Sequence, residues 1–164
     1  MNIVIADAGP IIALSRISKL YIFHRLFQQI VITETVRDEI LDNDHHLGKS
    51  VIRETMNAGW IQIKSVNLMA WKPVNAGVDA GESSAIFLAC QSTEPTLLII
   101  DDQAGRAEAC HHHIAIIGTA AVIGIAKEQG IINSARDVLM ELRDAGYYIG
   151  KSIIKTVLDD IGEC

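Results

Sequence analysis

The sequence predicts a three-layer α/β/α fold with a mostly parallel central sheet, on two observations. Short, uninterrupted runs of branched apolar residues recur along the chain, and such runs are typical of strands that helices cover on both faces. Segments with apolar residues at helical spacing lie between these runs, and this alternation favours an open parallel sheet. Because 164 residues suit one core, we expect a single domain over residues 1–164, in which residues 131–164 form a C-terminal helical extension.

Five strands are predicted, and their apolar patterns differ. The runs at 3–6, 97–100 and 114–117 are nearly all branched and apolar, and residues 30–32 form a shorter candidate. The run at 61–63 alternates as Ile-Gln-Ile, which favours a strand at the edge of the sheet.

Helices are predicted between the strands, from apolar spacing and from residues that begin or end helices. They are expected at 20–30, 82–90 and 103–112, and around Val36 and Ile40 after a cap by Thr33 or Thr35. Another is expected at 120–127, between a Thr119 cap and Gly130. A final pair of helices begins at Asn133 or Ser134 and is broken at Gly146 and Gly150. Two stretches, 43–50 and 64–78, are irregular, and loops of this length are either functional flaps or surface decoration.

The charge balance restricts the classes of function. Lys and Arg number 14 against 20 Asp and Glu, a formal net charge of −6, which argues against a protein that binds nucleic acid mainly by neutralising phosphates. An enzyme that meets nucleic acid through a bound divalent metal is still allowed, because the cation reverses the sign of a carboxylate-rich cleft. The apolar runs are too short to span a membrane, the first residues do not resemble a signal peptide, and the three cysteines form no framework, so we expect a cytoplasmic protein.

Carboxylates follow two of the predicted buried strands directly. Asp7 comes after the run at 3–6, and Asp101 and Asp102 come after the run at 97–100. Ligands of an open parallel sheet bind outside the carboxyl ends of its strands, so these acids are expected at one edge. Helix capping by Asp7 and Asp102 is the structural alternative. A cap explains one acid per strand end but not the doublet, and like charges at close range repel unless a proton or a cation lies between them.

Two glutamates extend this set. On the helix predicted at 82–90, Glu82 shares a face with apolar residues such as Ala85, so its carboxylate lies at the end of a buried stripe, where an unpaired charge is costly. An anion at the positive end of the helix dipole is the structural alternative. Glu39 borders the apolar face that carries Ile40, and a solvated position at the rim of that face is its structural alternative.

Oxygen donors with no nearby Cys and no clear His partner suit a hard cation, Mg²⁺ or Mn²⁺. Such a site activates water and stabilises the charge of an in-line displacement at phosphorus, so the predicted reaction is hydrolysis of a phosphodiester. A phosphatase or phosphotransfer domain with a strand-end Asp nucleophile is a second enzyme hypothesis. Haloacid-dehalogenase-type enzymes have a second acid at the position where this chain has Gly9. Receiver domains carry their acid pair near the amino terminus, whereas the doublet here falls at 101–102. Both differences count against this hypothesis.

Several stretches together resemble one family. They read IADAGPIIAL at 5–14, VITETVRDEI at 31–40, DAGESSAI at 79–86, LIIDDQAGR at 98–106 and IGT at 117–119. In this order and spacing they are similar to the PIN-domain superfamily of metal-dependent ribonucleases, which includes the VapC-like toxins, and more closely to a PIN subfamily of nucleic-acid-binding proteins. The resemblance covers most of residues 3–130.

The resemblance implies roles for the acids. Asp7 matches the first-strand acid of the family and Glu39 the acid on the helix after the second strand, while Glu82 stands where many PIN domains have the shorter Asp. Asp101 and Asp102 occupy the last acidic position, and either of them could be the direct ligand. Ile100 stands where many PIN domains have Thr or Ser, a departure that bears on whether one or two ions bind.

We therefore expect an Mg²⁺- or Mn²⁺-dependent endoribonuclease. Its predicted catalytic residues are Asp7, Glu39, Glu82, Asp101 and Asp102, of which Asp7, Glu82 and Asp101 or Asp102 are the predicted metal ligands. The resemblance to the VapC-like toxins implies a toxin–antitoxin role, a homodimer and a neutralising antitoxin protein as partner. A non-catalytic PIN-like module that binds nucleic acid or a protein is the alternative.

Two cations are candidate contacts to the phosphates of RNA, Arg16 and Arg106. An ion pair with Asp102, four residues earlier on the same helix, is the structural alternative for Arg106, and an ordinary surface cation is the alternative for Arg16. The three consecutive histidines at 111–113 fan around a helix end, so we expect a solvated terminus there and not a ligand set.

Overall fold

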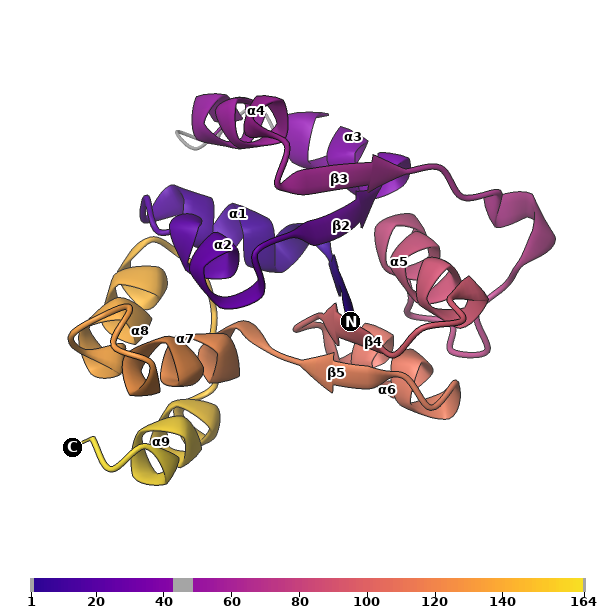
Figure 1. The fold of residues 1–164 in the computed structure, drawn as a ribbon. Coiled ribbons are helices and arrows are strands. Elements are labelled where there is room, and N and C mark those ends of the chain that lie inside the picture. The colour runs from indigo at the N-terminus through magenta and orange to yellow at the C-terminus, as the bar shows by residue number, and fades with distance from the viewer. Residues whose placement is uncertain (1, 43–48, 164) are drawn as a thin grey trace.

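The computed structural model describes residues 2–42 and 49–163, and it confirms the predicted fold class (Figure 1). A five-stranded sheet has the order β3-β2-β1-β4-β5, and every pairing in it is parallel. The strands are β1 (Ile3–Ala6), β2 (Ile30–Thr33), β3 (Ile61–Lys64), β4 (Thr96–Ile99) and β5 (Ala115–Ile117). All five predicted strands are therefore present, and β3 lies at an edge as predicted.

Helices connect the strands and cover both faces of the sheet. They are α1 (Ala8–Arg16), α2 (Tyr21–Phe27), α3 (Glu34–Asp42), α4 (Lys49–Ala58), α5 (Ala80–Gln91), α6 (Gln103–His111), α7 (Thr119–Glu128), α8 (Ala135–Asp144) and α9 (Lys151–Asp160), with the 3-10 turn η1 at Leu68–Ala70. Within the described residues, no helix is both long enough and apolar enough to cross a membrane.

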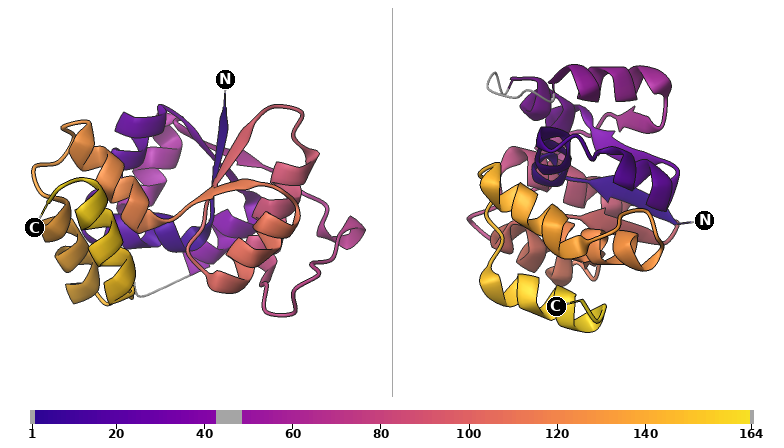
Figure 2. Two further views of the ribbon diagram at one scale, coloured as in Figure 1. Left: turned by 90° about the horizontal axis from the view of Figure 1, so that it is seen from below. Right: turned by 90° about the vertical axis from the view of Figure 1, so that its left-hand side faces the viewer.

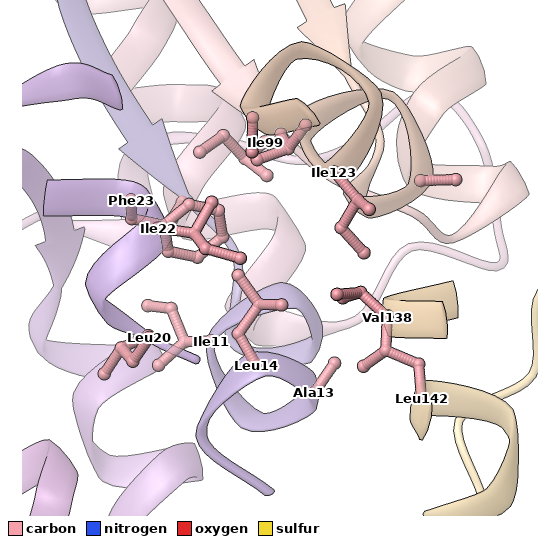
Figure 3. Close-up of a cluster of buried hydrophobic side chains, with 14 of the residues drawn as sticks. Ile11, Ala13, Leu14, Leu20, Ile22, Phe23, Ile99, Ile123, Val138 and Leu142 are labelled. Atoms are coloured by element: carbon pink, nitrogen blue, oxygen red, sulfur yellow. The ribbon is translucent and has the colours of Figure 1, made fainter. Parts of the chain in front are cut away.

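Successive residues of each strand face opposite layers, because side chains alternate across a sheet. In β4, Leu98 belongs to the apolar cluster that α5 and α6 complete, whereas Ile99 belongs to the larger cluster with α1, α2 and α7. Figure 3 shows Ile99 near Ile22 of α2 and Ile123 of α7. The sheet is thus buried on both faces, which explains why its central strands read as continuous apolar runs.

The last two helices pack onto the outside of the larger cluster. Val138, Leu139 and Leu142 of α8 are buried in it, and α9 contacts both α7 and α8. Figure 2 shows α8 and α9 next to each other on the α7 side of the molecule. The segment between α8 and α9 contains Tyr147, which packs against the larger apolar cluster.

The structure differs from the predicted elements at several of their ends and in one additional helix. Gly118 and not Thr119 is the N-cap of α7, and Thr119 is the first residue of the helix. The helix predicted at 20–30 ends at Phe27, because Gln28 has a φ of 65°. Of the irregular stretch predicted at 43–50, residues 43–48 lie outside the described residues, and α4, which the sequence reasoning missed, begins at Lys49.

Candidate metal centre

The sheet carries the predicted strand-end acids to one edge. Strands β1 and β4 are neighbours in register, with Ala6 opposite Ile99, so the residues that follow them leave the same edge of the sheet. The backbone N–H of Asp7 continues this pairing, because it donates to the carbonyl oxygen of Ile99 at 3.0 Å. Asp7, between β1 and α1, and the doublet, between β4 and α6, therefore begin at neighbouring positions on this edge.

Asp7 is a buried carboxylic acid, one oxygen of which has no hydrogen-bond partner among the described residues. It occupies the N-cap position of α1, yet its side chain makes no capping hydrogen bond, so the capping alternative is wrong for this side chain. It is only 7% exposed, and within the described part of the chain its buried Oδ1 has no hydrogen-bond partner. Burial raises the pKa of Asp7 to about 8, and the charges of Glu82 and Glu39 add to the increase.

Glu82 lies in the first turn of α5 and is also buried. It forms a capping box with Asp79: the Glu82 N–H donates to Asp79 Oδ1 at 2.8 Å, and the Asp79 N–H donates to Glu82 Oε2 at 3.1 Å. Burial raises the pKa of Glu82 to about 7, and the charges of Asp79, Asp102 and Glu39 act in the same direction. The Glu82 carboxylate therefore takes part in capping α5 and also lies near other negative charges.

Glu39 reaches the same region from α3. Gly81 makes room for it, because a Cβ built at Gly81 would overlap a carboxylate oxygen of Glu39. Glu39 is exposed, in agreement with a position at the rim of the apolar face, and its partial desolvation and the charge of Asp79 raise its pKa. Asp79, an acid that sequence reasoning did not select, therefore adjoins the predicted set, and its signal was the capping-box spacing Asp-x-x-Glu at 79–82.

The two acids of the doublet have different environments. Asp102 is the N-cap of α6, where its Oδ2 accepts the N–H groups of Ala104 at 3.0 Å and Gly105 at 3.2 Å. Asp101 instead contacts the start of α7: its Oδ1 accepts the N–H of Thr119 at 2.8 Å, and its Oδ2 accepts the Thr119 hydroxyl at 2.6 Å and the Tyr147 hydroxyl. The capping alternative thus describes Asp102 correctly. Asp101 does not cap this helix and has a separate set of contacts.

The candidate phosphate contacts lie at different distances from this edge. Arg106 donates from Nη1 to the carbonyl oxygen of Ile100 at 2.9 Å, so its guanidinium stays beside the doublet. Arg16 is the last residue of α1, whereas Asp7 immediately precedes that helix. At a rise of 1.5 Å per residue, Arg16 lies about 12 Å along the helix axis from its first residue. Only an extended substrate could contact both ends of α1.

The structure couples most of the predicted acids but does not assemble a finished metal site. The charges of Glu82, Glu39 and Asp79 raise the pKa of Asp7, and the charges of Asp79, Asp102 and Glu39 raise the pKa of Glu82. The charge of Asp79 also raises the pKa of Glu39. Among residues 2–42 and 49–163, however, no group of three His, Cys, Asp or Glu side chains is arranged to hold a metal ion. The donor set still fits a divalent cation, since it consists of carboxylate oxygens, carries excess negative charge and includes the unpartnered Oδ1 of Asp7.

Ile100, the departure from the family pattern, has a packing role. Its side chain is completely buried in the cluster that α5 and α6 form, and its Cδ1 approaches Gly105. The apolar residue therefore contributes to the core beneath the site and not to the donor set.

Comparison with known proteins identifies a relationship over nearly the whole chain. A family model described as a PIN domain matches residues 3–163. No curated protein and no solved structure matches the sequence.

Proposed function

Because the chain belongs to the PIN-domain family, whose members are generally nucleases that use divalent metal ions, we propose that it is an endoribonuclease that hydrolyses RNA phosphodiester bonds with Mg²⁺ or Mn²⁺. The observation that carries the proposal is the buried Oδ1 of Asp7. It lacks a hydrogen-bond partner among the described residues, and the negative charges of Glu82, Glu39 and Asp79 raise the pKa of its carboxyl group further. A cation would compensate this arrangement, because burying like charges without a counter-charge is unfavourable.

Asp7, Glu82 and one or both of Asp101 and Asp102 would hold the cation, with Glu39 as a further donor. The chemistry that a bound divalent cation supplies is activation of water and stabilisation of negative charge on the phosphoryl oxygens. In the hydrolysis, a water oxygen adds to phosphorus, one P–O ester bond breaks, and the leaving oxygen takes a proton.

The side chains of the protein supply orientation and charge. Thr119 holds Asp101 through two hydrogen bonds, and the N-terminus of α6 holds Asp102 through two more. Both carboxylates are therefore restrained before any ligand arrives, which lowers the entropic cost of binding. Arg106, fixed by its bond to the Ile100 carbonyl, is the cation that we expect to contact a phosphate.

A non-catalytic binding module is the second candidate. It is favoured by the environment of Asp101, whose two oxygens already accept three hydrogen bonds, and by the apolar Ile100 just before it. A site of this kind would bind Mn²⁺ weakly or would bind it without cutting RNA. The partners expected from the resemblance, an antitoxin protein and a second copy of this chain, stay predictions, as does a toxin–antitoxin role.

The test is a cleavage assay with a matched pair of variants. Purified protein with Mn²⁺ or Mg²⁺ should cut end-labelled RNA, single-stranded or structured, and chelation by EDTA should stop the reaction. Asp7→Asn should abolish cleavage, because an amide of the same shape cannot ionise and so cannot provide the carboxylate that a bound cation needs. Asp38→Asn is the control, since Asp38 is exposed and pairs with Arg37 at 2.9 Å. Cleavage that survives Asp7→Asn would indicate a contaminating nuclease or a different site.

A further inference from the structure

Tyr147 reaches the candidate metal centre from the C-terminal helices. Helix α8 ends at Asp144, and Gly146 then adopts a φ of 90°. The Gly146 N–H donates to the carbonyl of Arg143 at 3.0 Å, and the Tyr147 N–H donates to the carbonyl of Leu142 at 2.9 Å. These two bonds form a Schellman motif, in which a left-handed glycine closes the helix. The backbone of Tyr147 is thus fixed by the end of α8.

The Tyr147 side chain contacts the candidate metal centre through its hydroxyl. That hydroxyl donates to Asp101 Oδ2, the oxygen that also accepts the Thr119 hydroxyl. A Cβ built at Gly9, in the first turn of α1, would lie 3.5 Å from the same hydroxyl oxygen. The phenol group therefore lies between the start of α1, which follows Asp7, and the carboxylate of Asp101.

We propose that Tyr147 is a positioning residue, which fixes the orientation of the Asp101 carboxylate for binding of the divalent cation; this inference rests on the proposed function. Two donors on Oδ2, from Thr119 and Tyr147, satisfy both acceptor positions of that oxygen. The backbone N–H of Thr119 takes one position on Oδ1. The acceptor position left on Asp101 is therefore on Oδ1, and rotation of the carboxylate would break three hydrogen bonds.

The contact depends on the hydroxyl and not on the ring. The ring packs against the larger apolar cluster, and a phenylalanine would preserve this packing. Only the phenol oxygen reaches Asp101, so removing it leaves Oδ2 with the Thr119 hydroxyl alone. Groups that orient a metal-binding carboxylate typically change metal affinity or activity by about 10- to 100-fold when they are removed. The inference also makes the segment between α8 and α9 part of the site.

The experiment compares Tyr147→Phe with Tyr148→Phe in the full chain. Tyr148 is the neighbouring residue and is 88% exposed, so its variant controls for loss of a tyrosine hydroxyl in the same segment. Mn²⁺ affinity is measured by calorimetry, and kcat and KM are measured on labelled RNA. Tyr147→Phe should weaken Mn²⁺ binding about 10-fold and lower kcat by a similar factor, with KM for RNA unchanged. Tyr148→Phe should match the wild type in all three.

A second background separates positioning from general destabilisation. In an Asp101→Asn chain, Tyr147→Phe should cause little further loss of Mn²⁺ affinity, because the group that it positions has been changed. If Tyr147→Phe binds Mn²⁺ like the wild type, or if the two losses are additive, the inference is overturned while the proposed function stands. A wild-type chain that neither binds Mn²⁺ nor cuts RNA overturns the proposed function, and the positioning role with it.

Discussion

The carboxyl group of Glu82 lies against Gly105, a residue of α6 that has no side chain to exclude it. A Cβ built at Gly105 would lie 3.3 Å from Cδ of Glu82 and 2.5 Å from Cδ1 of Ile100. Gly105 is also one of the two residues whose backbone N–H groups donate to the capping carboxylate of Asp102. This glycine therefore lets helices α5 and α6 bring Glu82 and Asp102 together, and it couples the packing of Ile100 to the acidic edge.

We predict that Gly105→Ala disturbs the site although it adds a better helix former. Alanine within a helix is ordinarily more stable than glycine by about 1 kcal/mol. Here the added methyl group would push on the end of the Ile100 side chain and on the Glu82 carboxyl. We expect no gain in the free energy of unfolding, measured with urea, and a severalfold loss of Mn²⁺ affinity, measured by calorimetry.

Gly9→Ala is the matched control for this substitution. Gly9 also lies in the first turn of a helix, and its added Cβ would have an ordinary contact of 3.5 Å with the Tyr147 hydroxyl. It should therefore be more stable than the wild type, and it should bind Mn²⁺ within about twofold of the wild type. Equal behaviour of the two variants would show that the contact between Gly105 and Glu82 has no consequence.

The sequence predicted the fold well because burial on both faces leaves a local signal. Each strand at the centre of the sheet is a short apolar run, and Asp7 and the doublet at 101–102 follow two of these runs directly. The order of the strands was not predicted, since it depends on where the connections cross and not on the residues of any one strand. Helix α4 was missed because its sequence, Lys49–Ala58, continues from a polar stretch that reads as a loop.

The candidate site was only partly predictable. Asp7, Glu82 and the doublet were selected because strand ends and helix faces are local features, whereas Tyr147 lies 46 residues after Asp101 and follows no motif that points to it. The different environments of Asp101 and Asp102 were equally hidden. They depend on Thr119, which the parallel pairing of β4 and β5 brings alongside.

A second prediction concerns the pH dependence of stability in the absence of metal. Burial and neighbouring acids raise the pKa of Asp7 to about 8, from an ordinary value of 3.8. Between these values the folded chain retains a proton that the unfolded chain has released, so the free energy of unfolding falls as the pH rises. The slope from this carboxyl is at most about 1.4 kcal/mol per pH unit. Glu82, with a pKa raised to about 7, adds to the fall at lower pH.

Urea unfolding in EDTA, from pH 4 to pH 9, measures this slope. Asp7→Asn should remove most of the fall between pH 7 and pH 8, where Glu82 is already half or more deprotonated. Saturating Mg²⁺ should reduce the fall in the wild type, because the cation binds the deprotonated carboxylates of the folded chain and therefore stabilises it more as the pH rises. Identical slopes for wild type and Asp7→Asn between pH 7 and pH 8 would contradict the assignment of the raised pKa to Asp7.

Glu108 of α6 holds the long connection between β3 and α5. It is completely buried, and its carboxylate accepts the backbone N–H groups of Val74 and Asn75, each at 2.8 Å. The Asn75 side-chain amide, at 2.6 Å, and His112 Nε2, at 3.0 Å, complete the set. Burial alone would raise the pKa of Glu108, but these hydrogen bonds outweigh it and lower the pKa to about 2. The charged form is therefore the one that anchors the connection.

The third prediction is that Glu108→Gln frees this connection. The Gln amide nitrogen cannot accept the donors that now face the carboxylate, so at neutral pH the free energy of unfolding should fall by roughly 1–3 kcal/mol. Because the folded-state pKa is depressed, the contribution of Glu108 is fully present above pH 4.5 and is lost as the pH falls toward 2, so the variant should lose less stability over that range.

Amide hydrogen exchange at Val74 and Asn75 reports the local effect and should accelerate in Glu108→Gln. Glu128→Gln, an exposed position at the end of α7, should leave both amides protected, and equal exchange in the two variants would mean that the carboxylate does not anchor the connection.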